Sequence, residues 1–116
     1  MTSSHDYKKD RRNDKIKIFV NGKFLDRNNA KISVFDSGFL LGDGVWSGIR
    51  LHNGKLLFLT EHLQRLYDDA KAISLKIHVN KKELTKYLIQ TVKKNKMLSD
   101  VHIRLIISRG IKSTPY

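Results

Sequence analysis

The chain has 116 residues, a formal net charge of +12 and an apolar fraction of 40%. This length suits one domain or one lobe of a larger protein, and the absence of cysteine excludes disulfides and thiolate metal sites. No apolar run approaches the roughly 20 residues that span a bilayer, and the polar N-terminus lacks the apolar core of a secretory signal. We therefore expect a cytoplasmic protein with no membrane association.

The basic charge has two physical interpretations. A lysine-rich surface keeps a protein soluble, whereas a concentrated basic face binds nucleic acid. Part of the excess lies in residues 1–15, where both signs are mixed, as is typical of a solvated arm. We expect a flexible arm over 1–15 and one folded domain over 16–116, and do not expect a nucleic-acid partner. A basic nucleic-acid-binding module stays as the rival hypothesis.

The first elements are strands. Residues 16–20 alternate apolar and polar side chains, which predicts a half-buried strand. Asn21-Gly22 is typical of a two-residue hairpin turn, and residues 23–26 form the return strand. A loop is expected over 26–29, and alternation over 31–35 predicts a further strand.

A glycine-punctuated stretch follows, with glycine at positions 38, 42, 44 and 48. Glycines this dense inside an apolar run indicate bulges or a close approach of the backbone to a neighbour. Residues 45–51 and 55–59 are predicted to form two strands joined by the turn His52-Asn53-Gly54.

The hydrophobic period then changes to that of helices. Thr60 is the expected N-cap of a first helix, with Glu61 in its first turn, and Asn80 with Glu83 forms the capping-box pattern of a second. Residues 101–108 alternate again and predict a final strand. The predicted fold class is α+β, with two helices packed on an antiparallel sheet. The apolar stripes of the two helices are Leu63, Leu66, Tyr67, Ala70 and Ile73 or Ser74, then Leu84, Tyr87, Leu88, Thr91 and Val92.

No metal site is predicted, because the five histidines are scattered over different elements without helical pairing. Arg65 lies away from the first helical stripe, so it is either a solvated side chain or an anion ligand. Arg104 shares a strand face with His102; this is either an exposed sheet face or a pair of basic groups for one carboxylate. Trp46 is either core or the wall of a ligand pocket.

Four separate stretches resemble the opening of class IV aminotransferases, a family that includes branched-chain and D-amino-acid aminotransferases and aminodeoxychorismate lyase. The resemblance extends over about residues 16–110, nearly all of the expected folded chain. The matching stretches are Phe19-Val20-Asn21-Gly22, residues 38–46, Gly48-Ile49-Arg50 and residues 61–66.

The resemblance implies the N-terminal lobe of the D-amino-acid aminotransferase-like fold, with pyridoxal 5′-phosphate in a cleft against a larger domain. Arg65, in the His-x-x-Arg-Leu motif, would hold the cofactor phosphate. Trp46 and Gly48 would line the substrate side, together with Leu41, where branched-chain members usually carry tyrosine. Arg104, in His-Ile-Arg, would help to receive the carboxylate of an acidic substrate.

No catalytic residue is assigned to this chain, because the family's Schiff-base lysine belongs to the second domain. We expect that domain to be missing from a truncated chain, and the fragment alone to be inactive. The implied substrates are an amino acid and a 2-oxo acid, and the full-length protein is expected to be a homodimer.

Substrate choice stays open at this stage. The sequence departs from branched-chain members at Ser47, where they usually carry glutamate, and residues 42–45 agree with D-amino-acid members. Residues 48–50 agree with the branched-chain type, and residues 111–116 lack the arginine and histidine of D-specific members. The interpretation therefore favours a branched-chain substrate, with D-amino-acid transfer or aminodeoxychorismate lyase chemistry as alternatives on the same scaffold.

Overall fold

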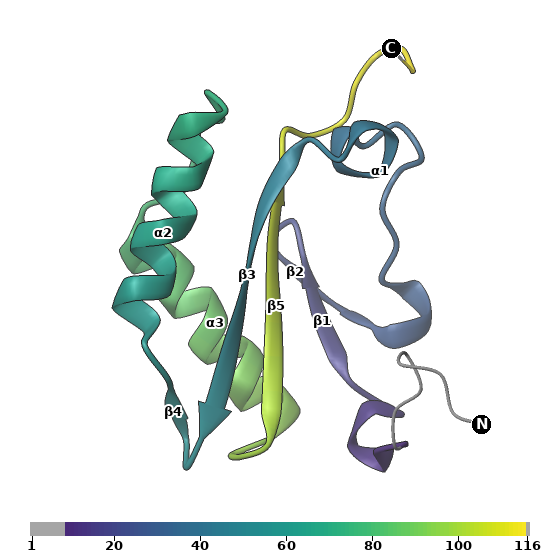
Figure 1. Ribbon diagram of the computed structural model, residues 1–116. Coiled ribbons are helices and arrows are strands. Elements are labelled where there is room, and N and C mark those ends of the chain that lie inside the picture. The colour runs from purple at the N-terminus through teal and green to yellow at the C-terminus, as the bar shows by residue number, and fades with distance from the viewer. Residues whose placement is uncertain (1–8, 116) are drawn as a thin grey trace, which may run out of the picture. The chain divides into compact units, whose positions relative to one another are not determined.

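The computed structural model describes residues 9–115, and the chain divides into two compact units, residues 1–31 and 32–116 (Figure 1). Each unit is described by itself. No helix in the described residues is both long enough and apolar enough to pass through a bilayer.

The first unit is a β-hairpin between two short 3-10 helices. Strands β1 (Lys17–Val20) and β2 (Lys23–Asp26) pair antiparallel, which confirms the predicted hairpin. Asn21 and Gly22 both have positive φ, 49° and 89°, as a tight two-residue turn requires. The 3-10 helices are Arg11–Asn13 and Arg27–Asn29, the second of which lies in the expected loop.

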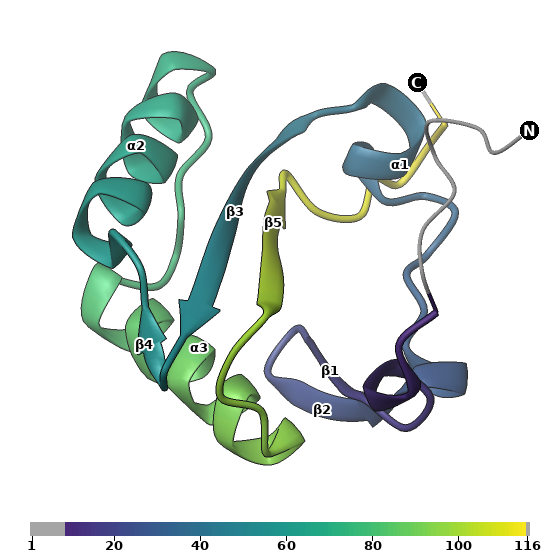
Figure 2. The same ribbon diagram turned by 60° about the horizontal axis from the view of Figure 1, so that its bottom comes forward.

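The second unit is an antiparallel sheet with two helices on one face (Figures 1 and 2). The strand order is β4-β3-β5, with β3 central and both pairings antiparallel. The predicted α+β class and the final strand are therefore confirmed. Its elements in chain order are α1 (Ser37–Leu41), β3 (Gly44–His52), β4 (Lys55–Leu56), α2 (Leu59–Ala72), α3 (Lys81–Asn95) and β5 (Val101–Ser108).

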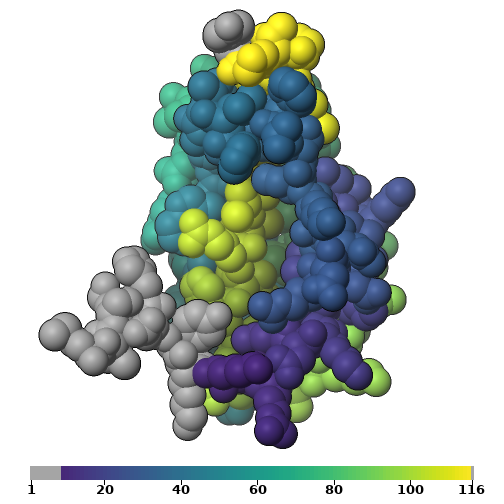
Figure 3. Space-filling model, turned by 90° about the vertical axis from the view of Figure 1, so that its right-hand side faces the viewer, coloured from purple at the N-terminus to yellow at the C-terminus, as the bar shows by residue number. Residues whose placement is uncertain are grey.

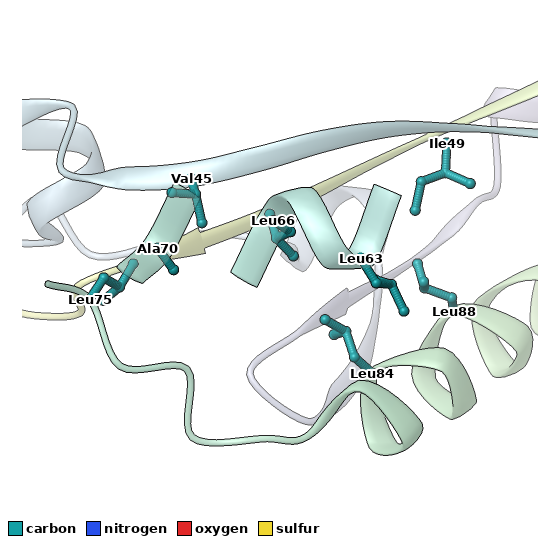
Figure 4. Close-up of a cluster of buried hydrophobic side chains, with 8 residues drawn as sticks. All are labelled: Val45, Ile49, Leu63, Leu66, Ala70, Leu75, Leu84 and Leu88. Atoms are coloured by element: carbon teal, nitrogen blue, oxygen red, sulfur yellow. The ribbon is translucent and has the colours of Figure 1, made fainter. Parts of the chain in front are cut away.

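The core lies between β3 and the two long helices (Figure 4). Odd-numbered residues of β3 point to the helices because side chains alternate along a strand, and Ile49 is fully buried. The predicted helical stripes supply the other side of the core, with Leu66 only 1% exposed. The buried members of the cluster are Val45, Ile49, Leu63, Leu66, Ala70, Leu75, Leu84 and Leu88.

The strand predicted over 31–35 is wrong. These residues are irregular, with Ile32 and Val34 exposed, and they have no strand partner in the part of the chain that the structure describes. The segment instead ends in a turn, where Asp36 N donates to Ser33 O at 3.0 Å. Alternation alone does not produce a strand without a neighbouring strand to accept its hydrogen bonds.

The glycine-rich stretch forms a short helix that the sequence did not predict. Asp36 caps α1 by accepting a hydrogen bond from Gly38 N at 2.8 Å, and Gly42 ends it in the left-handed conformation, φ 65°. The expected close approach occurs at Gly44, where a Cβ would lie 2.7 Å from the carbonyl oxygen of Ile107. This glycine therefore allows the start of β3 to pack closely against the end of β5.

The boundaries before α2 also differ from the prediction. Strand β4 contains only Lys55–Leu56, and Phe58, at φ 53°, is the N-cap in place of Thr60. The left-handed residue turns the chain directly from the hairpin into the helix, so the helix begins at Leu59, two residues earlier than an N-cap at Thr60 would give. The cap of α3 is as predicted, because Asn80 Oδ1 accepts from Glu83 N at 2.8 Å.

Candidate functional site

The side of the sheet away from the helices carries the chemistry-bearing residues. Even-numbered residues of β3 and β5 point to this outer face, where Gly48 pairs with Arg104 and Arg50 pairs with His102. Figure 3 shows the yellow-green side chains of β5 at the surface. Helices α2 and α3 cover the other face, so Trp46, Arg104 and Ile106 are exposed and available to a ligand or to another layer of protein.

Arg104 and Trp46 lie against each other on this face. The guanidinium carbon of Arg104 lies 4.1 Å from the centre of the Trp46 ring, a cation–π arrangement. Trp46 is 55% exposed, which excludes the first of its two sequence interpretations, that of a core residue. The Arg104 side chain makes no hydrogen bond or ion pair with a described residue, so its guanidinium N–H groups are free to bind a carboxylate.

Gly48 lies beneath the ring of His102. A Cβ at position 48 would come within 2.5 Å of His102 Cε1 and 2.8 Å of Nε2. Because residue 48 has no side chain, the imidazole of His102 occupies the space above it. His102 was expected to share this face with Arg104. That its ring lies over Gly48 depends on the strand register, which the sequence does not reveal.

Arg65 lies on α2 and is exposed, as the helical stripe predicted. Its side chain makes no hydrogen bond or ion pair with other described residues, so the guanidinium is free for an anion. Helix α2 packs on the inner face of β3, the face opposite Trp46 and Arg104. Leu41, at the end of α1, is 57% exposed.

A contact that sequence reasoning missed joins the first turns of α2 to β3. Ser47 Oγ lies 3.0 Å from His62 Nδ1, and Ser47 is buried on the helix side of the sheet. The signal was present, because position 47 is an odd-numbered residue of a strand whose odd-numbered residues face the helices. This bond positions α2, and therefore Arg65, on the sheet.

Arg109 is a second missed residue. Its Nε donates to Asp43 at 2.6 Å, while its terminal nitrogens donate to the carbonyls of Ser74 at 3.0 Å and Ile73 at 2.7 Å. The hydrogen bond from Arg109 lowers the pKa of Asp43, and the same bond raises the pKa of Arg109. One side chain thus ties the end of β5 to the C-terminal end of α2.

Comparison with known proteins identifies the scaffold. A family model described as amino-transferase class IV matches residues 44–115, more than half of the chain. The chain belongs to the class IV aminotransferase family. The match includes both strands of the outer face and all of α2, so Trp46, Gly48, Arg65 and Arg104 lie within the family region.

Several curated relatives carry aminotransferase names. A "putative branched-chain-amino-acid aminotransferase" of Methanocaldococcus jannaschii is 46% identical over 96 residues, which are 83% of this chain and 33% of that protein. A D-alanine aminotransferase of Listeria innocua is 36% identical over 98 residues, 84% of this chain and 34% of that protein. The chain spans about a third of the length of these relatives.

Solved structures give the same assignment. The branched-chain aminotransferase of Thermoproteus uzoniensis, solved with norvaline, is 31% identical with a TM-score of 0.74, over 88% of this chain and 35% of that one. The branched-chain enzyme of Escherichia coli is 28% identical with a TM-score of 0.76, over 83% and 34%. A further branched-chain aminotransferase, also 28% identical with a TM-score of 0.76, was solved as a complex with N-(5′-phosphopyridoxyl)-L-glutamate. The predicted N-terminal part of this fold type is therefore confirmed.

Proposed function

We propose that this chain is the N-terminal lobe of a pyridoxal-phosphate-dependent aminotransferase that exchanges an amino group between a branched-chain amino acid and a 2-oxo acid. The observation that carries the proposal is the outer face of β3 and β5, where the exposed Trp46, Gly48 and Arg104 are neighbours. That face belongs to a chain 46% identical to a putative branched-chain-amino-acid aminotransferase.

Arg65 is the residue proposed to hold the cofactor. Its exposed guanidinium has no partner in the described residues, and a planar fork of N–H donors fits a phosphate group. Arg65 follows His62, whose bond to Ser47 sets the position of this part of α2. When bound, pyridoxal phosphate supplies an electron-withdrawing ring that stabilises negative charge at the substrate α-carbon.

Substrate binding is assigned to the outer face, with Leu41 as a further wall. Arg104 receives a carboxylate, and its position on the Trp46 ring leaves the N–H edge of the guanidinium open for that bond. Trp46 presents a broad apolar surface to the substrate side chain. The His102 ring covers Gly48, so a substrate that reaches the backbone there moves this ring aside.

The activity is proposed for the complete enzyme, because the chain spans only about a third of the length of its relatives. No residue of this chain is assigned to proton transfer; the lysine that binds the cofactor is assigned to the second domain, and the fragment alone is proposed to be inactive. The complete enzyme is proposed to be a homodimer.

The test compares two cations of α2 in the complete enzyme. Replacing Arg65 with glutamine removes the charge-assisted bonds to the phosphate, so we expect the dissociation constant of pyridoxal phosphate to rise about 10- to 100-fold. Lys71→Gln removes an exposed charge from the same helix and is expected to change cofactor affinity less than about twofold. Equal affinity in Arg65→Gln and the parent enzyme would exclude Arg65 as the phosphate ligand.

D-amino-acid transfer is the second candidate, because D-alanine aminotransferases are 35–38% identical over most of this chain. The branched-chain proposal is preferred because the identity to the branched-chain relative is higher, 46%. Residues 111–116 also lack the arginine and histidine expected of D-specific members.

A further inference from the structure

An apolar groove lies on the helix side of the sheet, away from the outer face. It runs between the C-terminal half of α3 and the β3–β4 hairpin and has a volume of about 430 Å³. Its apolar lining includes Leu56, Ile89, Val92, Met97 and Leu98. This volume is in the range of about 300–1,000 Å³ that is typical of small-molecule sites.

Hydrogen bonds from the backbone of the β3–β4 turn tie the walls of the groove together. Gly54 N, in the hairpin turn, donates to Leu98 O at 2.8 Å, and Asn53 N donates to Ser99 Oγ at 2.8 Å. The side chain of Leu98 also passes 3.7 Å from the position of a Cβ on Gly54. These bonds hold the segment after α3 against the hairpin, so the groove is formed before any ligand arrives.

Large apolar side chains are left exposed in this groove. Leu98 is 68% exposed and Ile89 is 42% exposed. Single exposed apolar residues are common on protein surfaces, but here two of them line one concave surface with other apolar groups. Covering this surface would remove apolar area from water, which favours an apolar occupant.

The charge of the groove has one sign. Lys93 and Lys96 line it, and no acidic residue does so. Neither ammonium group has a hydrogen bond or ion pair with a residue of the described chain. Lys93 lies in the last helical turn and suits the helix dipole, but that role does not require an apolar groove beside it. The charge therefore favours an anion with an apolar body.

We propose that this groove binds a small fatty carboxylate, with the acyl chain on the apolar lining and the carboxylate paired with Lys93 and Lys96. The apolar lining selects the chain, and the two unpaired ammonium groups select the negative head. The proposal does not depend on the proposed aminotransferase function, because none of its residues lies on the outer face of β3 and β5.

The test is an NMR titration of the 116-residue chain with sodium octanoate and, separately, with octan-1-ol. We expect octanoate to shift the amide signals of the groove lining and to bind roughly five- to tenfold more tightly than hexanoate, because two more methylenes are buried. Octan-1-ol carries the same chain without the charge, so it should bind the same residues more weakly.

Two matched lysine pairs, one at the C-terminal end of α3 and one near its start, separate the effect of the carboxylate charge from that of the acyl chain. In Lys93→Gln/Lys96→Gln we expect octanoate affinity to fall about tenfold and octan-1-ol affinity to change less than about twofold. Lys82→Gln/Lys86→Gln removes two exposed lysines outside the groove and should leave both affinities unchanged. Leu98→Ser, at an exposed position, should weaken both ligands.

Two results would overturn the proposal. One is octanoate-induced shifts that lie outside the groove lining. The other is an octanoate affinity that falls equally in the two lysine pairs, since this would indicate general attraction to a basic protein.

Discussion

At Gly48 the missing side chain provides room for a neighbour. A methyl group there would come within 2.5 Å of His102 Cε1, so Gly48→Ala forces the imidazole to move. We expect a loss of about 1 kcal/mol in the free energy of unfolding, at the low end for overpacking because the ring is exposed and can turn. Urea denaturation measures this change.

The companion variant is His102→Ala. In its background Gly48→Ala should cost nothing, because the atoms that clash are gone. A cost that is the same with and without His102 would show that the backbone, and not the imidazole, resists a side chain at this position.

The Asp43–Arg109 bond predicts a pH dependence. The hydrogen bond from Arg109 lowers the pKa of Asp43 in the folded chain, so its stabilising effect is present above the ordinary aspartate value of about 3.9 and is lost as the pH falls through the folded value. We expect the difference in Tm between the parent and Asp43→Asn to be constant above about pH 5 and to shrink as the pH falls below the ordinary aspartate value.

The control for this prediction removes the partner. In an Arg109→Gln background, the Tm difference that Asp43→Asn causes should depend much less on pH. The reason is that the hydrogen bond from Arg109, the main cause of the lowered Asp43 pKa, is absent. A Tm difference that does not change with pH in the parent background would contradict a stabilising role of the Asp43–Arg109 hydrogen bond.

The site residues differ in how far the sequence could predict them. Alternation along a strand was enough to place Arg104 and His102 on one face, and the helical period was enough to expose Arg65. The contact of Arg104 with Trp46 depends on the β3–β5 register, which joins two strands that are far apart in the sequence and leaves no local signal. Arg109 was missed because two of its acceptors are backbone carbonyls, which any residue could supply.

Among the elements, α3 offers the clearest test of local structure. Asn80 caps it through the hydrogen bond from Glu83 N, and replacing Asn80 with alanine leaves that N–H unpaired. We expect a loss of about 1 kcal/mol in the free energy of unfolding, measured by urea denaturation. Gln90→Ala, exposed in the middle of the same helix, should not destabilise the chain; a similar loss in both variants would contradict a capping role.

The two long helices, the two hairpins and the last strand follow from patterns within about 15 residues, so sequence alone predicted them. Both Asn-Gly turns have positive φ at each central residue, as that dipeptide favours. The irregular segment over 31–35 was predicted as a strand because alternation does not reveal whether a partner strand exists. The N-cap at Phe58 was missed because a phenylalanine with positive φ is uncommon and carries no sequence signal.

At the scale of the second unit, the two faces of one sheet have different tasks. Helices α2 and α3 cover the inner face and form the core, while the outer face keeps Trp46 and Arg104 exposed. A sheet that is buried on one face allows this division, because alternate residues of each strand point to opposite faces. In the proposed function the outer-face residues of β3 and β5 bind the substrate, and the core on the other face of the sheet holds them in place.

The measurement to make first is steady-state amino transfer to 2-oxoglutarate by the complete enzyme, with L-valine and D-alanine as alternative donors. We predict a kcat/KM for L-valine at least about tenfold higher than for D-alanine, a difference of about 1.4 kcal/mol in transition-state binding. Preference for D-alanine would contradict the branched-chain assignment, and the absence of transfer from either donor would contradict the proposed aminotransferase function.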